Sequence, residues 1–426
     1  MNHDHPYYFL SEANCPFHCD PSSSSSTVLT RREWLARSAA AASLLALGDW
    51  APLLRAEEAP PPAHRPNRAK TAPSLPVAIQ RCESYEPGLV RQRLDAALDA
   101  IGGIGRLVSG KTVTVKVNMT APAKDMAGLP ASRTYHIHPN VVAALCAALD
   151  RAGARRIAIV EAWYHKETPE ELLTKAGWDL KAIQSAGGQK VVFENTKNLG
   201  SWGKYSQVKV PWGGYLFPAF ELNGWYDKTD VFVSLGKMKD HGTAGVTMTV
   251  KNLFGITPTA LYGDDAPNED TVKARVAPLH KNERPLPAGV PAQLGANPTN
   301  DAVVRVPRIT AVLLGARPVD LGIIDGVESI RNGEGWWNKG VEPLQPKLLF
   351  AGRNAVCTDA VCTAAMGYDP LSGHGQFPFP GENHLLWAAE AGIGTHDIAR
   401  IEVVGLKIKD ALCRFRTAPA TTGKPS

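Results

Sequence analysis

Apolar residues along this chain follow two alternating patterns from about Val77 onward. Short apolar runs rich in β-branched residues predict strands, and these runs are Thr112–Val117, Arg156–Glu161, Lys190–Phe193, Val231–Leu235, Val319–Ile324, Lys347–Ala351 and Arg400–Val404. Segments with apolar residues every three to four positions predict helices, namely Pro139–Ala152, Pro169–Ala176, Val246–Phe254, Val304–Leu314, Ala355–Met366 and His384–Gly392. A strand, a helix and a strand in this order are typical of a βαβ unit. The pattern therefore predicts an α/β fold, with a mostly parallel β-sheet or sheets, helices on both faces, Rossmann-like layering and long inserted loops.

Two long segments interrupt this alternation. Residues 162–230 are less regular and contain many aromatic and glycine residues, so a division into two lobes near residues 200–230 is one possibility. Residues 262–300 are rich in proline, glycine and charge; loops of this length are functional or disordered, and whether this one closes over a site as a lid stays open. We predict one α/β domain over residues 77–410, or its two lobes, followed by a tail at 411–426.

The first 56 residues do not follow the pattern of a folded domain. Thr30-Arg31-Arg32 precedes an uncharged, alanine-rich stretch, Ser38–Gly48, and together they resemble a twin-arginine export signal. The apolar stretch is too short to span a bilayer, and the proline-rich residues 57–76 are typical of a tether. We therefore expect a leader and signal peptide over 1–56, the twin-arginine export machinery as a partner, and a periplasmic or extracellular protein with no transmembrane segment after cleavage. The alternative is a chance Arg-Arg pair before an amphipathic helix.

The leader before the paired arginines is longer than such signals usually are. Residues 1–29 include five consecutive serines, Ser22–Ser26. We therefore expect translation to start near Val28 or Leu29, which sequencing of the precursor's N-terminus would test.

Composition and charge narrow the classes of function. The chain is 44% apolar and 20% charged, with a formal net charge of +5, which are ordinary values for a globular protein. No run of lysine or arginine forms a nucleic-acid footprint, so we do not expect a nucleic-acid partner. Signal cleavage would remove Cys15 and Cys19, and the remaining cysteines show no C-x-x-C spacing. We therefore expect neither a structural zinc nor an iron–sulfur cluster.

Polar residues lie at or just after the ends of several predicted strands. Ligands in open parallel sheets bind outside the carboxyl ends of the strands, so these residues are candidates for a site. Lys116 and Asn118 have a period of two and would share one face if the strand continues; an exposed strand end is the equal alternative. The other strand ends carry Glu161, Lys237 with Lys239 and His241, Asp325 with Gly326, and Arg353 with Asn354.

The densest group of candidates lies in the segment KMKDHGTAGVTMTVKNLFG, which starts at Lys237. Lys237, Lys239 and His241 alternate, so an extended segment would place all three on one side. This arrangement predicts a site for a phosphate or a carboxylate, with a solvated loop as the alternative. The spacing matches neither the P-loop nor G-x-G-x-x-G, so nucleotide binding by those modes is not expected.

A glycine turn and a predicted helix complete the same segment. Backbone N–H groups at a helix start favour an anion, so the helix start is part of the predicted anion site. Thr247 and Lys251 are i, i+4 neighbours on one face of that helix, and Asn252 follows Lys251 directly.

Two aspartates and two histidines are further candidates. Asp325 ends a predicted buried strand, and it is a general base, a metal ligand or a turn former. Asp359 lies in an otherwise apolar helix, where a buried charge needs a partner, so its alternative role is structural. His136 and His138 form an H-x-H pair that can chelate a metal, although no third ligand is evident.

Several motifs together resemble the family catalogued as domain of unknown function 362. They are VKVN from Val115, HPNVVAALCAALDRAGARRIAIVE, TDVFVSLGKMKDHGTAGVTMTVKNLFGITP, DLGIIDGV, AVCTDAVCTAAMG and HLLWAAEAGIG, and they run from about Val113 to Gly405. The resemblance implies that one shared site contains Lys237, Lys239, His241, Lys251, Asn252, Asp325 and Asp359. Some relatives carry ferredoxin-like iron–sulfur modules, and this chain has none. Asp240 stands where relatives more often have Thr, which puts a role for Asp240 in doubt.

These observations predict an exported enzyme that acts on a small anionic substrate. His241 would be a general acid/base or a metal ligand, and Asp325 and Asp359 would orient the reacting groups or bind a divalent cation. The predicted substrate-binding residues are Lys116, Asn118, Lys237, Lys239, Thr247, Lys251 and Asn252. Two alternatives stay open: a non-catalytic periplasmic binding protein for an anionic metabolite or a metal, and a cofactor-bearing redox protein.

Overall fold

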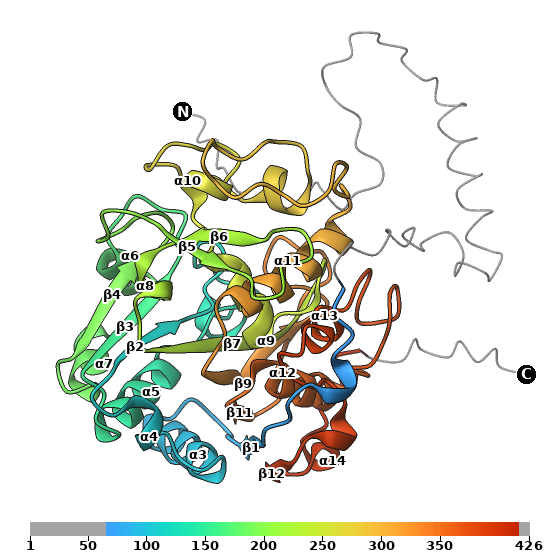
Figure 1. Cartoon of the computed structure of the whole chain (residues 1–426). Helices are drawn as coiled ribbons and strands as arrows, with labels where there is room; N and C mark the ends of the chain where they lie inside the picture. Colours follow the sequence, from blue (N-terminus) through green and yellow to red (C-terminus); the bar gives the residue numbers. More distant parts are fainter. Residues whose placement is uncertain (1–64, 417–426) are drawn as a thin grey trace, which may run out of the picture. The chain divides into compact units, whose positions relative to one another are not determined.

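The computed structural model describes residues 65–416, in which a large mixed sheet has helices packed on both faces (Figure 1). The predicted signal peptide, residues 57–64 of the predicted tether and residues 417–426 lie outside the described part, so what the sequence predicts for them stays a prediction. Within residues 65–416, no helix is both long enough and apolar enough to cross a membrane.

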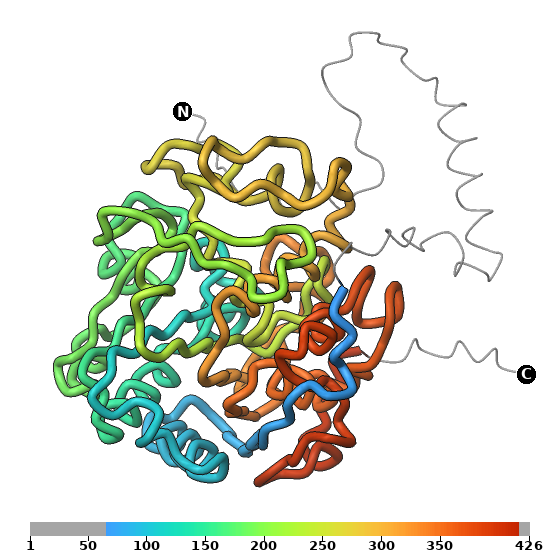
Figure 2. Tube along the Cα trace, viewed as in Figure 1, coloured from blue at the N-terminus to red at the C-terminus, as the bar shows by residue number. Residues whose placement is uncertain are grey.

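The main sheet has the strand order β12-β1-β11-β9-β7-β2-β3-β4. Its strands are β1 (Val77–Arg81), β2 (Thr112–Lys116), β3 (Arg156–Glu161), β4 (Val191–Asn195), β7 (Val231–His241), β9 (Leu321–Arg331), β11 (Leu348–Gly352) and β12 (Val403–Gly405). The five strands from β9 to β4 are parallel, and β11 is antiparallel to both of its neighbours. Figure 2 shows the first described segment, in blue, beside the last, in red, where β1 pairs with β12. The predicted α/β class with a mostly parallel sheet is confirmed.

The alternation of side chains along the strands gives the sheet two separate cores. Val113 and Val115 of β2 point to one face, and Ala158 and Val160 of β3 point to the other. The first face is covered by α3 (Pro87–Ala100), α4 (Gly105–Val108), α5 (Pro139–Arg151), α6 (Pro169–Lys175) and α7 (Leu180–Ala186). The second face is covered by α9 (Met248–Lys251), α11 (Ala302–Ala316), α12 (Ala355–Ala365) and α13 (His384–Glu390). Apolar burial on both faces is what the sequence pattern requires of a parallel sheet.

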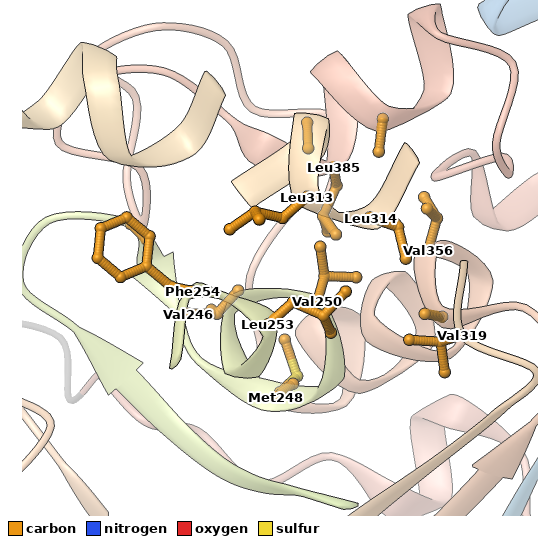
Figure 3. Close-up of a cluster of buried hydrophobic side chains, with 14 of the residues drawn as sticks. Val246, Met248, Val250, Leu253, Phe254, Leu313, Leu314, Val319, Val356 and Leu385 are labelled. Carbon is orange, nitrogen blue, oxygen red and sulfur yellow. The ribbon is translucent and has the colours of Figure 1, made fainter. Parts of the chain in front are cut away.

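The helices of the second face pack around α9 and the 3-10 helix η3 (Asn252–Ile256) that continues it. Figure 3 shows Met248, Val250, Leu253 and Phe254 of this segment among side chains from α11, α12 and α13. The other labelled residues are Val246, Leu313, Leu314, Val319, Val356 and Leu385, of which Val246 lies in β8 (Gly245–Val246) and Val319 between α11 and β9. This packing fixes α9 beside the carboxyl end of β7.

The strands β7 and β9 are longer than the sequence predicts. The predictions ended them at Leu235 and Ile324, but they continue to His241 and Arg331. The polar residues taken as strand ends therefore lie inside strands, and Lys237 is paired in register with Asp325. The predicted helix also begins two residues later, at Met248. The prediction failed because buried, mutually paired charges interrupt the apolar pattern without ending the strand.

Other elements were not predicted. The helices α3 and α7 have no counterpart among the predicted helices, and the segment 201–222, taken as irregular, contains the hairpin of β5 (Ser206–Lys209) and β6 (Ala219–Leu222). Two short strands, β8 (Gly245–Val246) and β10 (Glu342–Leu344), pair with β7 and β9.

The segment 262–300 is held against α11 by a buried arginine. It follows α10 (Thr259–Tyr262), contains the single helical turn η4 (Val276–His280) and runs as the yellow stretch in Figures 1 and 2. Arg305 of α11 donates to the carbonyl oxygens of Pro278 and Thr299, both at 2.8 Å. The segment thereby brings Arg275 and His280 into the interior near α9.

Candidate functional site

The chain leaves the carboxyl ends of β2 and β7 in opposite directions across the sheet. From β2 it passes through α5 to β3 on one side, and from β7 it passes through α9 and α11 to β9 on the other. Ligands in open α/β sheets bind at such a switch point. β7 pairs with β2 only as far as Ser234, so residues 235–241 extend beyond the end of β2. Most of the predicted site residues lie at this point.

Asn252 joins the ends of β2 and β7. Its amide nitrogen donates to the Lys116 carbonyl and to Ser234 Oγ, and its Oδ1 accepts from Lys116 Nζ and Asn118 Nδ2, all at 3.1 Å. All four residues are buried. The Asn252 side chain therefore fixes the geometry of the switch point.

Replacing Asn252 with alanine should lower the free energy of unfolding by about 2–4 kcal/mol, because it leaves several buried donors and acceptors unpaired. Urea unfolding followed by circular dichroism measures this change. Asn297 is exposed, so Asn297→Ala is the matched control and should change stability by less than about 0.5 kcal/mol. Equal effects of the two substitutions would contradict a bracing role for Asn252.

Lys116 is committed to contacts within the protein. Its Nζ forms an ion pair with Glu161 of β3 and donates to the Val117 carbonyl at 2.8 Å. With the bond to Asn252, all three of its N–H donors are used. Asn118 Oδ1, by contrast, is buried and has no hydrogen-bond partner among residues 65–416. Of this predicted pair, Asn118 is the residue with an atom still able to contact a ligand.

Lys237 and Asp325 form a completely buried ion pair between β7 and β9. The Lys237 Nζ–Asp325 Oδ2 distance is 2.9 Å, and both side chains are 0% exposed. Lys237 Nζ also donates to Tyr85 Oη at 2.9 Å. The Asp325 carboxylate accepts further bonds from the Tyr85 hydroxyl and from the backbone N–H groups of His138 and Val327. Both charges are satisfied internally, which favours a structural role for this pair.

Asp359 of α12 occupies the start of α9. Its carboxylate accepts the backbone N–H groups of Thr249, at 3.0 Å, and Val250, at 2.7 Å, and the Thr249 hydroxyl. Burial raises the pKa of Asp359 to about 7, although these donors favour the ionised form. The helix start that was predicted to hold an external anion is thus filled by a carboxylate of the chain itself. Thr247 Oγ1 donates to the Asp240 carbonyl at 3.4 Å.

Lys239 and Lys251 are the lysines of this segment without a carboxylate partner. Lys239 Nζ donates to the carbonyls of Tyr135, at 2.9 Å, and Glu334, at 3.2 Å, and Lys251 Nζ lies 4.3 Å from the centre of the Phe254 ring. No Asp or Glu within residues 65–416 lies within ion-pair distance of either amine. Burial lowers the pKa of both lysines to about 7, and the negative charge of Glu334 opposes this. A buried cation without a counterion favours an added anion.

His241 is a neutral imidazole next to these two lysines. Burial, followed by the charges of Lys251 and Lys239, lowers the pKa of His241 well below its usual value. Its Nδ1 accepts the backbone N–H groups of Thr243 and Ala244, at 3.1 and 3.3 Å. The ring proton therefore sits on Nε2, which makes His241 a hydrogen-bond donor through that atom.

Two histidines that the sequence did not single out complete the group around Lys251. His280 of η4 stacks edge-on against Phe254, with ring centroids 5.0 Å apart, and His384 of α13 lies against Phe379. Burial, and then Lys251, lowers the pKa of His280 to about 4 and that of His384 to about 3. Both rings are therefore uncharged near neutral pH, so they add no second positive charge beside Lys251.

A pocket of about 350 Å³ opens at His241. Its walls come from the end of β7, the loop after β9 and the loop before α13, and its lining residues are Asp240, His241, Gly242, Gly245, Asn332, Gly333, Asn338, Gly375, Phe377, Pro378, Phe379 and Pro380. Gly245 has a φ of +80°, and a Cβ there would lie 2.7 Å from Phe379, so only glycine fits the turn. The volume is within the range of pockets that bind small organic molecules.

The H-x-H pair has structural contacts. His136 Nε2 lies 3.0 Å from the Thr120 carbonyl, and His138 Nδ1 accepts the backbone N–H of Asn140 while its ring stacks on Tyr85. Across the described part of the chain, no group of three or more His, Cys, Asp or Glu side chains is arranged to hold a metal ion. Five free cysteines, Cys82, Cys146, Cys357, Cys362 and Cys413, lie in the same part.

Comparison with known proteins assigns a family and little else. A family model described as "Domain of unknown function (DUF362)" matches residues 113–364, more than half of the chain. A thylakoid-associated protein of Synechocystis sp. is 26% identical over 188 residues, which cover 43% of this chain and 50% of the relative. The match thus spans about half the length of that curated relative.

Two solved structures share only a loose likeness to this chain. A protein from Thermotoga maritima has a TM-score of 0.35 at 11% identity, covering 68% of this chain and 60% of that one. The lactate racemase apoprotein from Thermoanaerobacterium thermosaccharolyticum has a TM-score of 0.33 at 15% identity, covering 64% and 54%. No argument about the site rests on either.

Proposed function

The chain belongs to the DUF362 family, whose description states no activity, and we propose that it is an enzyme that binds a small carboxylate- or phosphate-bearing substrate in the pocket at His241. The observation that carries the proposal is the positive charge of two buried lysines that act on pocket-lining His241 and that the Glu334 carboxylate offsets only through space, without an ion pair. Lys239 and Lys251 are buried without a carboxylate partner in residues 65–416, and both lower the pKa of His241, which lines the pocket.

His241 has the chemistry of a hydrogen-bond donor in this arrangement. Its Nε2–H is the polar ring atom left after Nδ1 has accepted two backbone N–H groups. A positive environment favours a developing negative charge on a substrate oxygen, and the Nε2–H of a neutral imidazole can donate a hydrogen bond to that oxygen. Four other predicted site residues do not contact the pocket and have buried contacts within the protein that stabilise this region. They are Lys116, Lys237, Asp325 and Asp359.

Removing either unpaired lysine should weaken anion binding while the fold persists. We expect Lys239→Met and Lys251→Met each to lower the affinity for glycolate, measured by isothermal titration calorimetry at pH 7, by at least about tenfold, as for a lost charge-assisted hydrogen bond. Lys181 is exposed, so Lys181→Met is the matched control and should bind as the wild type does. Lys251→Met and Lys181→Met should change the melting temperature little, whereas Lys239→Met removes the donor to the Tyr135 and Glu334 carbonyls and should lower it. Circular dichroism would confirm that all three variants are folded at the temperature of the titration.

His241→Gln distinguishes an enzyme from a binding protein. Glutamine keeps a hydrogen-bond donor but holds it on a flexible amide in place of the rigid, positioned imidazole. If the protein is an enzyme, the His241→Gln variant should retain its affinity for the anion and lose turnover. Proton nuclear magnetic resonance measures turnover as the disappearance of substrate signals, which should stop in the variant. Unchanged affinity in both lysine variants would overturn the proposed anion site itself.

A further inference from the structure

Asp240 is a second titratable group of the same pocket. It precedes His241 at the end of β7, and both residues line the cavity. Its Oδ1 accepts the hydroxyl of Tyr368 at 2.8 Å, and its Oδ2 accepts the backbone N–H of Asn332 at 2.7 Å. No Lys or Arg of the described chain forms an ion pair with it. A carboxylate can accept about four hydrogen bonds, so acceptor capacity remains on Asp240, which lines the pocket.

The pocket therefore combines two features that a simple anion cannot satisfy together. The pocket-lining His241, with the charges of buried Lys239 and Lys251 acting on it, favours an anionic group, whereas the carboxylate of Asp240 repels that group and needs a hydrogen-bond donor instead. A ligand that carries an anionic group and, one or two atoms away, a hydroxyl group satisfies both. Acetate or methylphosphonate would leave Asp240 facing a like charge.

We propose that this pocket selects small hydroxy acids, in which the anionic group lies toward Lys239, Lys251 and His241 and the hydroxyl group donates a hydrogen bond to Asp240. The inference rests on the proposed function, since it assumes the same anion site, and it adds the chemical class of the ligand. Asp240 becomes the residue that determines specificity, although its position in the sequence gave no reason to assign it a role.

The surroundings of Asp240 move its titration into the mildly acidic range. Burial raises its pKa to about 6, and the nearby negative charge of Glu334 acts in the same direction. The Asn332 N–H, the Tyr368 hydroxyl and the positive charge of Arg331 act in the opposite direction. At pH 7.5 the carboxylate repels an anion without a hydroxyl group, and at pH 5 this repulsion is removed.

Two matched pairs of probes test the selection. Isothermal titration calorimetry at pH 7.5 would compare glycolate with acetate, and hydroxymethylphosphonate with methylphosphonate. We expect the hydroxylated member of at least one pair to bind about tenfold more tightly or better, as for one hydrogen bond to a charged acceptor. Which pair binds identifies the anionic group as a carboxylate or a phosphoryl group. The preference should shrink at pH 5, mainly because acetate binds more tightly once Asp240 is protonated.

Variants at Asp240 and Tyr368 separate specificity from folding. Asp240→Asn removes the charge and should reduce the preference to under about threefold, by strengthening acetate binding. Tyr368→Phe keeps the carboxylate and should keep the preference at pH 8; thermal melts show whether both variants fold. Equal binding of both members in the wild type, or an undiminished preference in a folded Asp240→Asn, would overturn this inference and leave the anion site standing. A concentration of about 10 mM would detect even very weak binding. If none of the four anions binds at that concentration, both this inference and the proposed function are wrong.

Discussion

Replacing Lys237 with methionine should lower the free energy of unfolding by about 3–5 kcal/mol, the range found when one partner of a buried ion pair is removed. Methionine matches the length of the lysine stem and removes only the charged end. The substitution leaves the Asp325 carboxylate, which is 0% exposed, without its cation. Urea unfolding followed by circular dichroism measures the loss.

Two further variants identify the cause of this loss. Lys237→Met combined with Asp325→Leu removes both charges and should recover most of the stability, because a buried pair is often replaceable by apolar residues. Lys175 forms an ion pair with Glu167 in which the side chains are 67% and 38% exposed, so Lys175→Met should cost at most about 0.5 kcal/mol. A loss below about 1 kcal/mol for Lys237→Met would show that the pair is not a structural requirement.

This result would divide the lysine-rich segment into two functions. Lys237 and Lys239 are two residues apart on β7 and both reach the segment before α5, where Lys237 Nζ lies 3.5 Å from the Ser132 carbonyl and Lys239 Nζ lies 2.9 Å from the Tyr135 carbonyl. Lys237 and Lys239 therefore reach the same segment, although the register with β9 shifts between them. One lysine meets Asp325 and the other meets no carboxylate in residues 65–416. The two lysines of this spacing thus have different roles: Lys237 forms a structural ion pair, and Lys239 has no carboxylate partner.

The sequence predicts the sheet well where the strands are uniformly apolar. β2, β3 and α5 lie within one residue of their predicted ends because their buried faces have unbroken periodicity. β7 and β9 were cut short at Leu235 and Ile324. In the sequence, a lysine in one strand and an aspartate in the next each indicate that the strand has ended. Only the register between the two strands shows that their charges form an ion pair.

The candidate site is less predictable than the fold, since its parts come from distant segments. Lys239, Lys251 and His241 could be identified because they crowd one short stretch. His280 and His384 could not, because neither lies near Lys251 in the sequence, although His384 begins one of the family motifs; only the docking of η4 and α13 brings them near Lys251. The start of α9 was predicted to bind an external anion, but the Asp359 carboxylate occupies it. Asp359 lies 110 residues from Thr249 in the sequence, so this contact could not be predicted.

Anion affinity should fall steeply as the pH rises from 7 to 9. Lys239 and Lys251 have pKa values of about 7 in the free protein, and an anion is bound by their charged forms. Below pH 7 both amines are already charged, so the affinity is at its maximum. Above pH 7 each amine must take up a proton on binding, which costs about 1.4 kcal/mol, or tenfold in affinity, per pH unit and per lysine. With both lysines involved, glycolate should bind on the order of a thousandfold or more weakly at pH 9 than at pH 7.

Arginine substitutions test whether the loss of charge on Lys239 and Lys251 causes the decline in anion affinity. Arginine stays charged across this range, so Lys239→Arg and Lys251→Arg should each remove about one tenfold step per pH unit from the decline, provided that thermal melts show both variants folded. Glycolate and Asp240, whose pKa is about 6, are both largely ionised above pH 7, so neither can produce the decline. A wild-type affinity that stays constant up to pH 9 would mean that ordinary lysines, with pKa values near 10.4, hold the anion or that none do. In that case the positive charge beside His241 would not be the basis of binding.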